Sequence, residues 1–565
     1  MDELQIQLTG VVQQLFGVEI VPELTVAPDG TRADYASNIA LKLAKVVGKS
    51  PREVAEAIRT ELEHKGGAYQ IEVAGPGFLN FSLGEEYFEK KMREIAAGLI
   101  SPDEYSGQTI VAEFSDPNPF KVLHVGHLYT SVVGDAISRL LEFAGAKVVR
   151  ANFGGDVGLH VGKTLWAIMQ HNYSPDDITI DNIAACYVEG TAAYDEDAQA
   201  KEEITGLNKL VYRIAALGKT TSEALGGQEG TVAQLYWRGR ELSYQYFNDF
   251  YARIGLKFDK YYPESQVADR GLSEVKAHIG TTYEESDGAV VYRGEKVGLH
   301  TRVFINREGV PTYEAKDVGL IFTKWDDWHF DKSLVITGNE QADYMKVVLA
   351  SVREYAPELV ERTEHLTHGM VRLPGNVKMS SRKGNFLKAV DVIQMVEAEL
   401  ATNRGEVDQK VLLAAIKYAF LKYKVGGDIV FDPKESVSTS GNSGVYLLYA
   451  VVRAQKILQK TGGKTELNKK FVQLEGTPEQ SEAVRKLNKK VIQYAEVIRG
   501  AVAERAPYKL CNYLYELAQD FSKFYEVVPV AGSEYEAQRK VVVEAYLKVM
   551  RHGLGLLGIE VPEEM

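Results

Sequence analysis

Residues 109–152 read TIVAEFSDPNPFKVLHVGHLYTSVVGDAISRLLEFAGAKVVRAN, and this stretch decides the fold. Thr109–Phe114 is a short apolar run of the kind that forms a buried strand. Two prolines and an asparagine follow it and predict a loop over Ser115–Lys121. Apolar residues then recur at helical spacing as far as Gly145, where a helix should stop. Lys147–Asn152 predicts a second buried strand, which completes a strand–loop–helix–strand unit.

The start of the predicted helix carries His124, Gly126 and His127. Backbone amides without an intrahelical partner gather at a helix N-terminus, and with the helix dipole they favour phosphate. Because Gly126 has no side chain, a flat base can lie close to the backbone there. An isolated HxGH pattern serves equally well as a plain helix cap, so the rest of the chain has to decide between the two.

Composition limits the class of protein. A chain of 565 residues suggests roughly three or four domains, and 45% hydrophobic and 25% charged residues are ordinary for a globular protein. The two cysteines, Cys186 and Cys511, form no CxxC pair, which argues against a zinc knuckle or a disulfide framework and fits a reducing cytoplasm. No signal core or membrane-length apolar run is evident, so we expect a cytoplasmic protein with no membrane contact. A net charge of −13 argues against a nucleic-acid partner, although a local basic patch is compatible with it.

The chain predicts four successive parts. Residues 1–105 read as a small α+β domain, residues 106–390 as a parallel sheet with helical insertions, and residues 391–435 and 436–565 as helical. The predicted helices are Asp34–Val47, Pro51–His64, most of Asn182–Phe250, Asp391–Ala401, Asp408–Lys424, Gly444–Lys460, Pro478–Ala503, Lys509–Val527 and Glu534–Leu557. The further predicted strands are Gln70–Ala74, Phe78–Leu83, Ala289–Tyr292, Arg302–Ile305 and Leu334–Thr337, and the linker before the last domain is Gly426–Gly444.

A second chemical feature is the loop Lys378-Met379-Ser380-Ser381-Arg382-Lys383-Gly384-Asn385. Its cations can neutralise a triphosphate, and its small residues let the loop move. A basic surface loop is by itself usually only a solvated loop. Together, an HxGH turn and a KMS loop roughly 250 residues further on resemble a class I aminoacyl-tRNA synthetase.

Over nearly its whole length the chain is similar to the arginyl-tRNA synthetase family, in motifs that follow the family's order. The stretches that carry this resemblance are ADYASNIALKLAKVVGKSPREVAEAI (33–58), IEVAGPGFLNFSL (71–83), EFSDPNPFKVLHVGHL (113–128), NFGGDVGLHVG (152–162), FDKYYPES (258–265), PTYEAKDVG (311–319), HGMVRLPGNVKMSSRKGN (368–385), LCNYLYELAQDFSKFYEVVPV (510–530) and LGLLGIEVPEEM (554–565). The resemblance implies an α/β class I synthetase fold: a Rossmann-like catalytic domain with a helical insertion, a small α+β N-terminal tRNA-contacting domain, a helical connecting segment and an all-α anticodon-binding domain.

The resemblance also implies a reaction in two steps. The carboxylate of arginine attacks the α-phosphate of Mg²⁺-bound ATP to give arginyl-adenylate and pyrophosphate, and a terminal hydroxyl of tRNA(Arg) then takes the arginyl group. By analogy, His124 and His127 stabilise charge on the α-phosphate, and Gly126 lets the adenosine pack on the helix. The departing pyrophosphate is held by the loop residues Lys378, Ser380, Ser381, Arg382 and Lys383. ATP contacts are implied for Phe120, Asp156, Gly158 and Met379, and no protein-bound metal is expected.

The loop departs from the family's usual KMSKS pattern, because Ser381 stands where the second lysine belongs. Arginyl enzymes often lack that lysine, and a lysine just before the HxGH is thought to substitute for it. Lys121 occupies that position. We therefore expect Lys121 to contact phosphate rather than to be an idle surface lysine.

A guanidinium is a fixed fork of donors that requires carboxylates and other acceptors arranged in a plane. The family's arginine pocket maps onto Glu113, Asn118, Glu264, Tyr313, Asp317 and Gln341. Tyr313 and Asp317 share a face if their stretch is helical, and we expect Asp317 to make the bidentate guanidinium contact. Glu113 and Glu264 complete a negative pocket, while Asn118 and Gln341 bind the ammonium and carboxylate. Three features depart from the commoner family pattern: Asp116, which either pairs with the substrate ammonium or simply caps, His160, and Tyr344-Met345.

The C-terminal residues mix aromatic and cationic side chains, as recognition of single-stranded bases requires. The set expected to contact tRNA is Tyr446, Tyr449, Arg453, Lys456, Tyr508, Lys509, Asn512 and Tyr515. The resemblance implies a monomer. We also weigh a non-catalytic tRNA-binding paralogue, a small-molecule nucleotidyltransferase with HxGH chemistry, and a class I enzyme for another amino acid. The first would lose the histidines or acids, the second needs no tRNA modules, and a long apolar substrate would not suit the acids.

Overall fold

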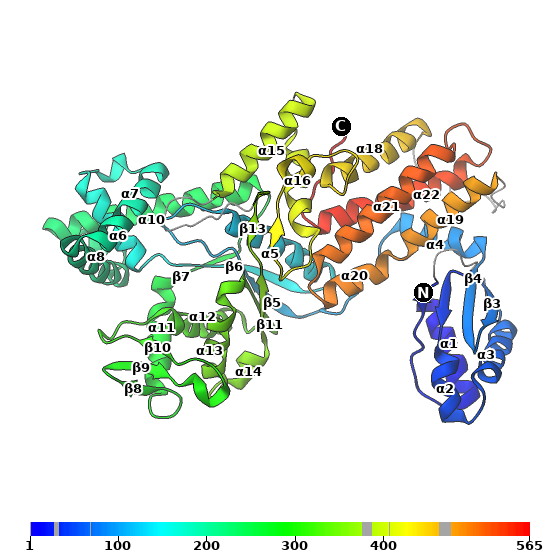
Figure 1. Cartoon of the computed structure of the whole chain (residues 1–565), viewed down its shortest axis with the longest axis horizontal. Coiled ribbons are helices and arrows are strands. Elements are labelled where there is room, and N and C mark those ends of the chain that lie inside the picture. Colours follow the sequence, from blue (N-terminus) through cyan, green and yellow to red (C-terminus); the bar gives the residue numbers. More distant parts are fainter. Residues whose placement is uncertain (1, 28–32, 68, 376–386, 406, 463–475) are drawn as a thin grey trace. The chain divides into compact units, whose positions relative to one another are not determined.

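The computed structural model describes residues 2–27, 33–67, 69–375, 387–405, 407–462 and 476–565 (Figure 1). The chain divides into two compact units. Unit 1 comprises Met1–Ile100, Arg453–Ala495 and Glu516–Met550, and unit 2 comprises Ser101–Val452, Glu496–Tyr515 and Arg551–Met565. In the described residues, no helix has the length and apolar character that crossing a bilayer requires.

Unit 1 contains an antiparallel sheet of order β1-β2-β4-β3, whose apolar side chains share one core with α1, α2 and α3. The capping box predicted at Ser50 is present, because its hydroxyl accepts from the Glu53 amide and the Glu53 carboxylate accepts from the Ser50 amide. The elements wholly in this unit are α1 (Asp2–Phe16), β1 (Thr25–Val26), β2 (Tyr35–Ser37), α2 (Ile39–Val47), α3 (Pro51–Lys65), β3 (Tyr69–Ala74), β4 (Phe78–Leu83), α4 (Glu85–Ala97) and α19 (Pro478–Ile492).

The helix predicted over Asp34–Val47 is wrong at its start, since Tyr35–Ser37 forms β2 and pairs with β4. Tertiary contacts override the local helical pattern here. The buried Asp34 carboxylate accepts from the Leu83 amide at 2.6 Å and lies 2.6 Å from Arg485 Nη2 on α19, which fixes this segment in an extended course. Lys489, also on α19, lies 3.2 Å from the same carboxylate.

Unit 2 is built on a parallel sheet of order β12-β11-β5-β6-β7. β5 therefore lies between the strand that follows it and a strand much later in the chain, which makes it the topological switch point. In such sheets the ligand binds beyond the carboxyl ends of the strands near that point. The strands are β5 (Thr109–Glu113), β6 (Lys147–Gly154), β7 (Lys260–Pro263), β11 (Lys332–Gly338) and β12 (Thr363–His368).

The strand–loop–helix–strand unit predicted from residues 109–152 is confirmed as β5, α5 (Val125–Phe143) and β6. His124 is the N-cap of α5. The helix is buried along most of its length, and at Gly134 a Cβ would lie 2.2 Å from the ring of Phe114, so only glycine lets it pack this closely on the sheet.

The helical insertion predicted over Asn182–Phe250 is confirmed, and its helices gather at one end of unit 2 (Figure 1). They are α7 (Ile180–Glu196), α8 (Ala198–Leu217), α9 (Lys219–Glu223) and α10 (Gly227–Arg253), and α6 (Leu159–Gln170) and η1 (Pro175–Asp177) precede the predicted range. After β7 come α11 (Glu264–Ala277), β8 (Glu284–Ser286), β9 (Ala289–Tyr292), η2 (Gly294–Val297), β10 (Arg302–Ile305), α12 (Tyr313–Trp328), η3 (Asn339–Gln341), α13 (Ala342–Arg353), α14 (Pro357–Glu361) and β13 (Val371–Arg372).

The later elements are α15 (Ala389–Arg404), α16 (Gln409–Leu421), β14 (Ile429–Val430), α17 (Pro433–Ser436), α18 (Gly444–Lys460), α20 (Tyr494–Ala503), α21 (Pro507–Val527) and α22 (Glu536–Leu556). Two predictions need correction. The helix expected over Pro478–Ala503 is interrupted at Gln493, and the expected linker Gly426–Gly444 contains β14 and α17. β14 pairs with β13, so its conformation depends on a partner distant in sequence.

Candidate active site

The predicted acids meet at the carboxyl edge of the parallel sheet. Glu113 is the last residue of β5, and Glu264 follows β7 directly as the first residue of α11. Each is paired with a buried lysine of α12: Lys324 Nζ donates to Glu113 at 2.6 Å, and Lys316 Nζ donates to Glu264 at 2.6 Å. The carboxylates of Glu113 and Glu264 are thus neutralised inside the protein.

Asp317 lies on α12, so the stretch that carries it is helical as expected. Its carboxylate is buried and accepts a hydrogen bond from the hydroxyl of Tyr344 on α13. Burial raises the pKa of Asp317 to about 8; the Tyr344 hydrogen bond opposes the shift, and the charge of Glu113 adds to it. The ring of Tyr344 in turn lies under the guanidinium of Arg302, which is 5.3 Å from the ring centroid.

Another carboxylate of the site, the half-buried Asp116, lies in the loop that follows β5. Its Oδ1 accepts from the Phe153 amide on β6 at 2.8 Å. Burial, and then the charge of Glu113, raise the pKa of the Asp116 carboxyl well above its ordinary value. Asn118, in the same loop, accepts from the amide of Gly155 at 2.8 Å.

The two remaining predicted pocket residues, Tyr313 and Gln341, are exposed to solvent. Tyr313 is the first residue of α12 and is 54% exposed, with Lys316 Nζ 5.0 Å from its ring centroid. Gln341 is exposed at the end of η3. Tyr313 shares its helix with Asp317, so the structure brings these two together as the spacing predicts.

The two histidines stack with ring centroids 3.8 Å apart at the start of α5. His124 Nδ1 accepts from the Gly126 amide at 3.1 Å, and His127 Nδ1 accepts from the His124 amide at 3.2 Å. Because both Nδ1 atoms accept, each neutral ring carries its proton on Nε2. Burial, and then the charge of Lys121, lower the pKa of His124 to about 4; burial and His124 itself lower the pKa of His127 well below its ordinary value.

Lys121 is close enough for its charge to act on both histidines and on His160, and its Nζ lies 4.9 Å from the ring centroid of Tyr187. His160 itself is buried, and its Nε2 donates to the Gly155 carbonyl at 2.8 Å. Lys121 and the histidine pair therefore share one site, at the positive end of α5.

The KMS loop lies outside the described residues, together with its predicted members Lys378, Met379, Ser380, Ser381, Arg382 and Lys383. The chain that follows it is described. The amide of Val125 donates to the Leu387 carbonyl at 2.9 Å, and the amide of Ala389 donates to the Leu123 carbonyl at 2.9 Å. Leu387–Ala389 therefore lies directly beside the turn that carries His124.

Of three residues predicted to contact ATP, two have fully buried side chains and the third is a glycine at the start of a helix. Phe120 is fully buried and stacks on Tyr236, and Gly158 is the N-cap of α6 at φ +126°. Asp156 is also fully buried, with its oxygens accepting from Arg240 Nε at 2.8 Å and from the Ser265 hydroxyl at 2.7 Å. Because both side chains are buried, Phe120 and Asp156 can contact a nucleotide only through their backbone atoms.

Sequence reasoning missed three residues of this site. Lys316 and Lys324 are the buried partners of the acids, and Gly155 is held so close that a Cβ would lie 2.7 Å from Asn118 Oδ1 and 3.0 Å from Glu264 Oε1. The available signal was limited to Lys324, which closely follows the apolar run Val318–Phe322 of α12, where an exposed lysine would be unusual. Lys316 stands between Glu314 and Asp317 and gave no such signal.

The residues expected to contact tRNA lie on two helices. In unit 2, Tyr446 on α18 and Tyr515 on α21 contact edge to face at 5.7 Å. Tyr449 and Asn512 are exposed on the same two helices, which also carry Tyr508 and Lys509. In unit 1, the guanidinium of Arg453 lies 5.2 Å from the ring centroid of Tyr525, and Lys456 is exposed.

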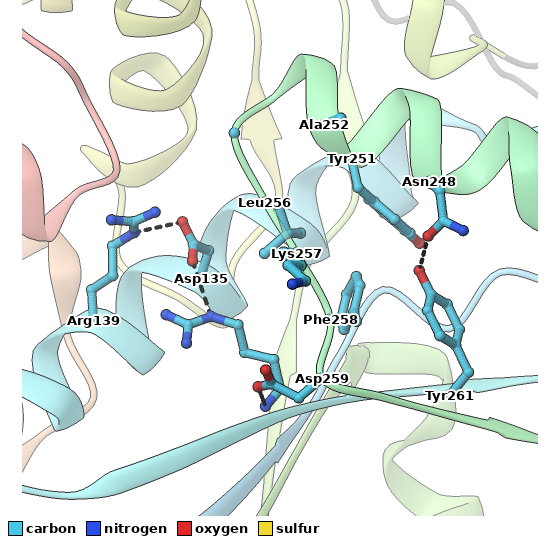
Figure 2. A pocket seen from close by; sticks show the side chains of 12 residues that line it. Asp135, Arg139, Asn248, Tyr251, Ala252, Leu256, Lys257, Phe258, Asp259 and Tyr261 are labelled. Atoms are coloured by element: carbon cyan, nitrogen blue, oxygen red, sulfur yellow. Dashed lines mark hydrogen bonds and ion pairs between the residues drawn. The ribbon is translucent and has the colours of Figure 1, made fainter.

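A separate cavity of about 660 Å³ opens beside α5, the end of α10 and the start of β7 (Figure 2). Its polar groups are engaged with one another: Asp135 lies 2.7 Å from Arg139 and 3.3 Å from Arg150, and the Tyr261 hydroxyl donates to Asn248. None of the predicted site residues that the structure describes lines this cavity. Within the described ranges, no group of three or more His, Cys, Asp or Glu side chains is arranged to hold a metal ion.

Three family models match the chain. Residues 95–432 match "tRNA synthetases class I (R), catalytic domain", residues 447–565 match "DALR anticodon binding domain", and residues 2–83 match "Arginyl tRNA synthetase N terminal domain". Two solved structures share the fold with a TM-score of 0.78: the arginyl-tRNA synthetases of Thermus thermophilus, at 22% identity with full coverage of both chains, and of Plasmodium falciparum, at 19% identity with 100% and 99% coverage.

Curated relatives match at similar length. The arginine–tRNA ligase of Shewanella loihica is 30% identical over 95% of this chain and 94% of its own, and that of Vibrio parahaemolyticus is 29% identical over 94% of each. With all three domain models matched in the expected order, the chain belongs to the arginyl-tRNA synthetases, the class I arginine–tRNA ligases (EC 6.1.1.19).

Proposed function

We propose that the arginine–tRNA ligase reaction of this chain takes place at the carboxyl edge of the parallel sheet, with the histidine pair on the ATP side and the acids of β5, α11 and α12 on the arginine side. One observation carries the proposal. The stacked His124 and His127 stand at the start of the helix that the switch-point strand β5 leads into, and the buried carboxylate Asp317 is on α12, which packs against β5.

In the first step, the carboxylate of arginine attacks the α-phosphate of ATP and pyrophosphate leaves. His124 and His127 act as neutral donors through Nε2–H, since both Nδ1 atoms accept from backbone amides. Gly126 keeps the turn open for the nucleoside, because a Cβ there would lie 2.9 Å from the His124 ring. Preorganised donors of this kind stabilise charge that develops on the phosphate in the transition state.

The cations complete the phosphate site. Lys121 contacts phosphate in place of the second lysine of the KMS loop, supported by its closeness to both histidines. Lys378, Ser380, Ser381, Arg382 and Lys383 hold the departing pyrophosphate, and Met379 contacts the nucleoside. Mg²⁺ enters with ATP as part of the substrate and supplies further neutralisation of its phosphates.

On the arginine side, Asp317 binds the guanidinium, with Tyr313 beside it on α12. Glu113 and Glu264 form ion pairs with Lys324 and Lys316, and these two pairs flank the contact between Asp317 and the guanidinium. Asn118 and Gln341 bind the amino-acid backbone of the substrate. The three acids are therefore not equivalent in arginine binding, because Glu113 and Glu264 are already neutralised by lysines.

In the second step, the arginyl group passes to the terminal hydroxyl of tRNA(Arg). We propose that Tyr446, Tyr449, Arg453, Tyr508 and Asn512 contact the anticodon region, and that residues 1–105 contact the outer corner of the tRNA. Domain boundaries at 105, 390 and 435, a monomeric state and a cytoplasmic location complete the proposal.

The test is ATP–pyrophosphate exchange with L-arginine, with and without tRNA, for the full chain and for His124→Ala. Loss of one preorganised donor should lower kcat by about 10²- to 10³-fold and leave the arginine KM nearly unchanged. The matched control is His171→Ala, because that histidine is paired with Glu189 on the exposed insertion. An unchanged kcat in His124→Ala would contradict the proposed phosphate site.

A further inference from the structure

The charge balance of the arginine site leaves two carboxylates without a cation. Glu113 and Glu264 are each paired with a buried lysine at 2.6 Å. Among the described residues, no Lys, Arg or His side chain forms an ion pair with Asp116 or Asp317. L-Arginine brings two cationic groups, the guanidinium and the α-ammonium, so the number of unpaired carboxylates matches the number of cations in the substrate.

Asn118 offers the α-ammonium at most one remaining lone pair of a neutral oxygen, and no negative charge. Its Oδ1 already accepts from the Gly155 amide at 2.8 Å, and that donor fixes which end of the amide group is the oxygen. The remaining Nδ2 is a donor, which suits the substrate's carboxylate. An ammonium has three donors and a positive charge, so it needs a charged acceptor from elsewhere.

Asp116 offers that acceptor. Its Oδ1 is held by the Phe153 amide at 2.8 Å, and no hydrogen bond from a described residue reaches its Oδ2. Ser115 and Asp116 both have left-handed backbones, at φ +77° and +48°. Such conformations cost about 1–3 kcal/mol each and persist where the surrounding structure imposes them. Here the Ser115 hydroxyl is held by the Tyr251 hydroxyl at 2.8 Å.

Position along the chain decides which carboxylate takes which cation. The α-ammonium sits on the same carbon as the carboxylate that attacks the α-phosphate, so it must lie on the side of His124. Asp116 belongs to the β5–α5 loop that runs on to Lys121 and His124, whereas Asp317 lies on α12 and contacts α13. We propose that Asp116 is the counter-ion of the arginine α-ammonium and Asp317 that of the guanidinium, an assignment that rests on the proposed arginine site.

Burial and the charge of Glu113 disfavour ionised Asp116 in the ligand-free protein. A bound ammonium relieves that cost, so binding and ionisation support each other. Asp116 is thereby a specificity-determining residue that selects substrates with a free α-amino group.

The experiment measures inhibition constants against L-arginine in ATP–pyrophosphate exchange by the full chain with tRNA present. Two analogues each remove one cation: 5-guanidinopentanoic acid lacks the α-amino group, and L-citrulline lacks the guanidinium charge. The full chain should bind each analogue at least about 30-fold more weakly than arginine, the size expected for losing one close charge pair.

Asp116→Asn retains an acceptor for the Phe153 amide and removes only the charge. It should reduce the preference for arginine over 5-guanidinopentanoic acid to within about threefold and keep the preference over citrulline. Asp317→Asn should do the reverse. Asp116→Ser provides a second variant should the asparagine form fold poorly.

Three results would overturn the inference: equal binding of 5-guanidinopentanoic acid and arginine by the unmodified chain, an unchanged preference in both Asp116 variants, or a loss of citrulline discrimination in Asp116→Asn. If Asp317→Asn leaves citrulline discrimination intact, the proposed arginine site fails, whatever Asp116 does. The two failures are therefore distinguishable.

Discussion

Replacing Asp317 by asparagine separates its charge from its hydrogen bond. The asparagine oxygen still accepts from Tyr344, while the negative charge that should face the guanidinium is lost. Removing one partner of a buried charge pair costs about 2–5 kcal/mol, so kcat/KM for arginine should fall roughly 30- to several-thousand-fold.

The raised pKa of Asp317 adds a pH signature. With a pKa of about 8, the carboxylate is ionised in about 1% of molecules at pH 6 and in half at pH 8. Only the ionised form binds a guanidinium, so the arginine KM should fall about 50-fold between these pH values. The KM of Asp317→Asn should be nearly independent of pH over the same range.

Stability should change in the opposite sense. The folded-state pKa lies above the ordinary value of 3.8, so the stability this group contributes is complete below about pH 3.8 and is lost as the pH rises through 8. The full difference is on the order of 5 kcal/mol. Asp317→Asn should therefore melt at a higher temperature than the unmodified chain at pH 8 to 9.

The assay is ATP–pyrophosphate exchange across pH 6–9, with thermal unfolding of the same samples. Asp343→Asn is the matched control, because that carboxylate is exposed on α13 and paired with Lys346. An Asp317→Asn enzyme that keeps the pH-dependent arginine KM, or whose kcat/KM falls less than threefold, would refute the reasoning.

Three further variants test other parts of the account. Lys121→Ala should slow adenylate formation in rapid-quench experiments by about 10²-fold or more, whereas Lys201→Ala on the exposed insertion should not; an unchanged rate in Lys121→Ala would remove this lysine from the phosphate site. Tyr344→Phe deletes the hydrogen bond that lowers the pKa of Asp317, so the arginine KM at pH 7 should rise about tenfold with kcat retained; a KM profile that does not move to higher pH would contradict this. Asp34→Asn leaves two cations of α19 without their buried carboxylate and should destabilise unit 1 by about 3–5 kcal/mol in urea unfolding; a change below about 1 kcal/mol would show the pair to be weak.

Local patterns predicted the elements that local interactions determine. The run Thr109–Phe114, the prolines after it and the apolar spacing to Gly145 each act over a few residues, and the structure places β5, a loop and α5 there. The helix prediction for Tyr35–Ser37 was wrong because the strand conformation of this segment depends on β4 and on Arg485, both distant in sequence.

The site shows the same division. The HxGH residues and the acids could be found from motifs, but their ionic partners could not. Lys324 is 211 residues from Glu113, and Tyr344 is 27 residues from Asp317, so no local spacing connects them. That two of three expected acids are neutralised internally is a property of the packed sheet and α12 alone.

The central claim is that an arginine is selected by two cation-free carboxylates beside a phosphate-binding turn. Its most direct test is ATP–pyrophosphate exchange by the full chain with each of the twenty amino acids and with L-citrulline, with and without tRNA. We predict that arginine drives exchange and that citrulline, equal in shape but without the charge, does not. Exchange driven as well by citrulline, or better by another amino acid, would contradict the account.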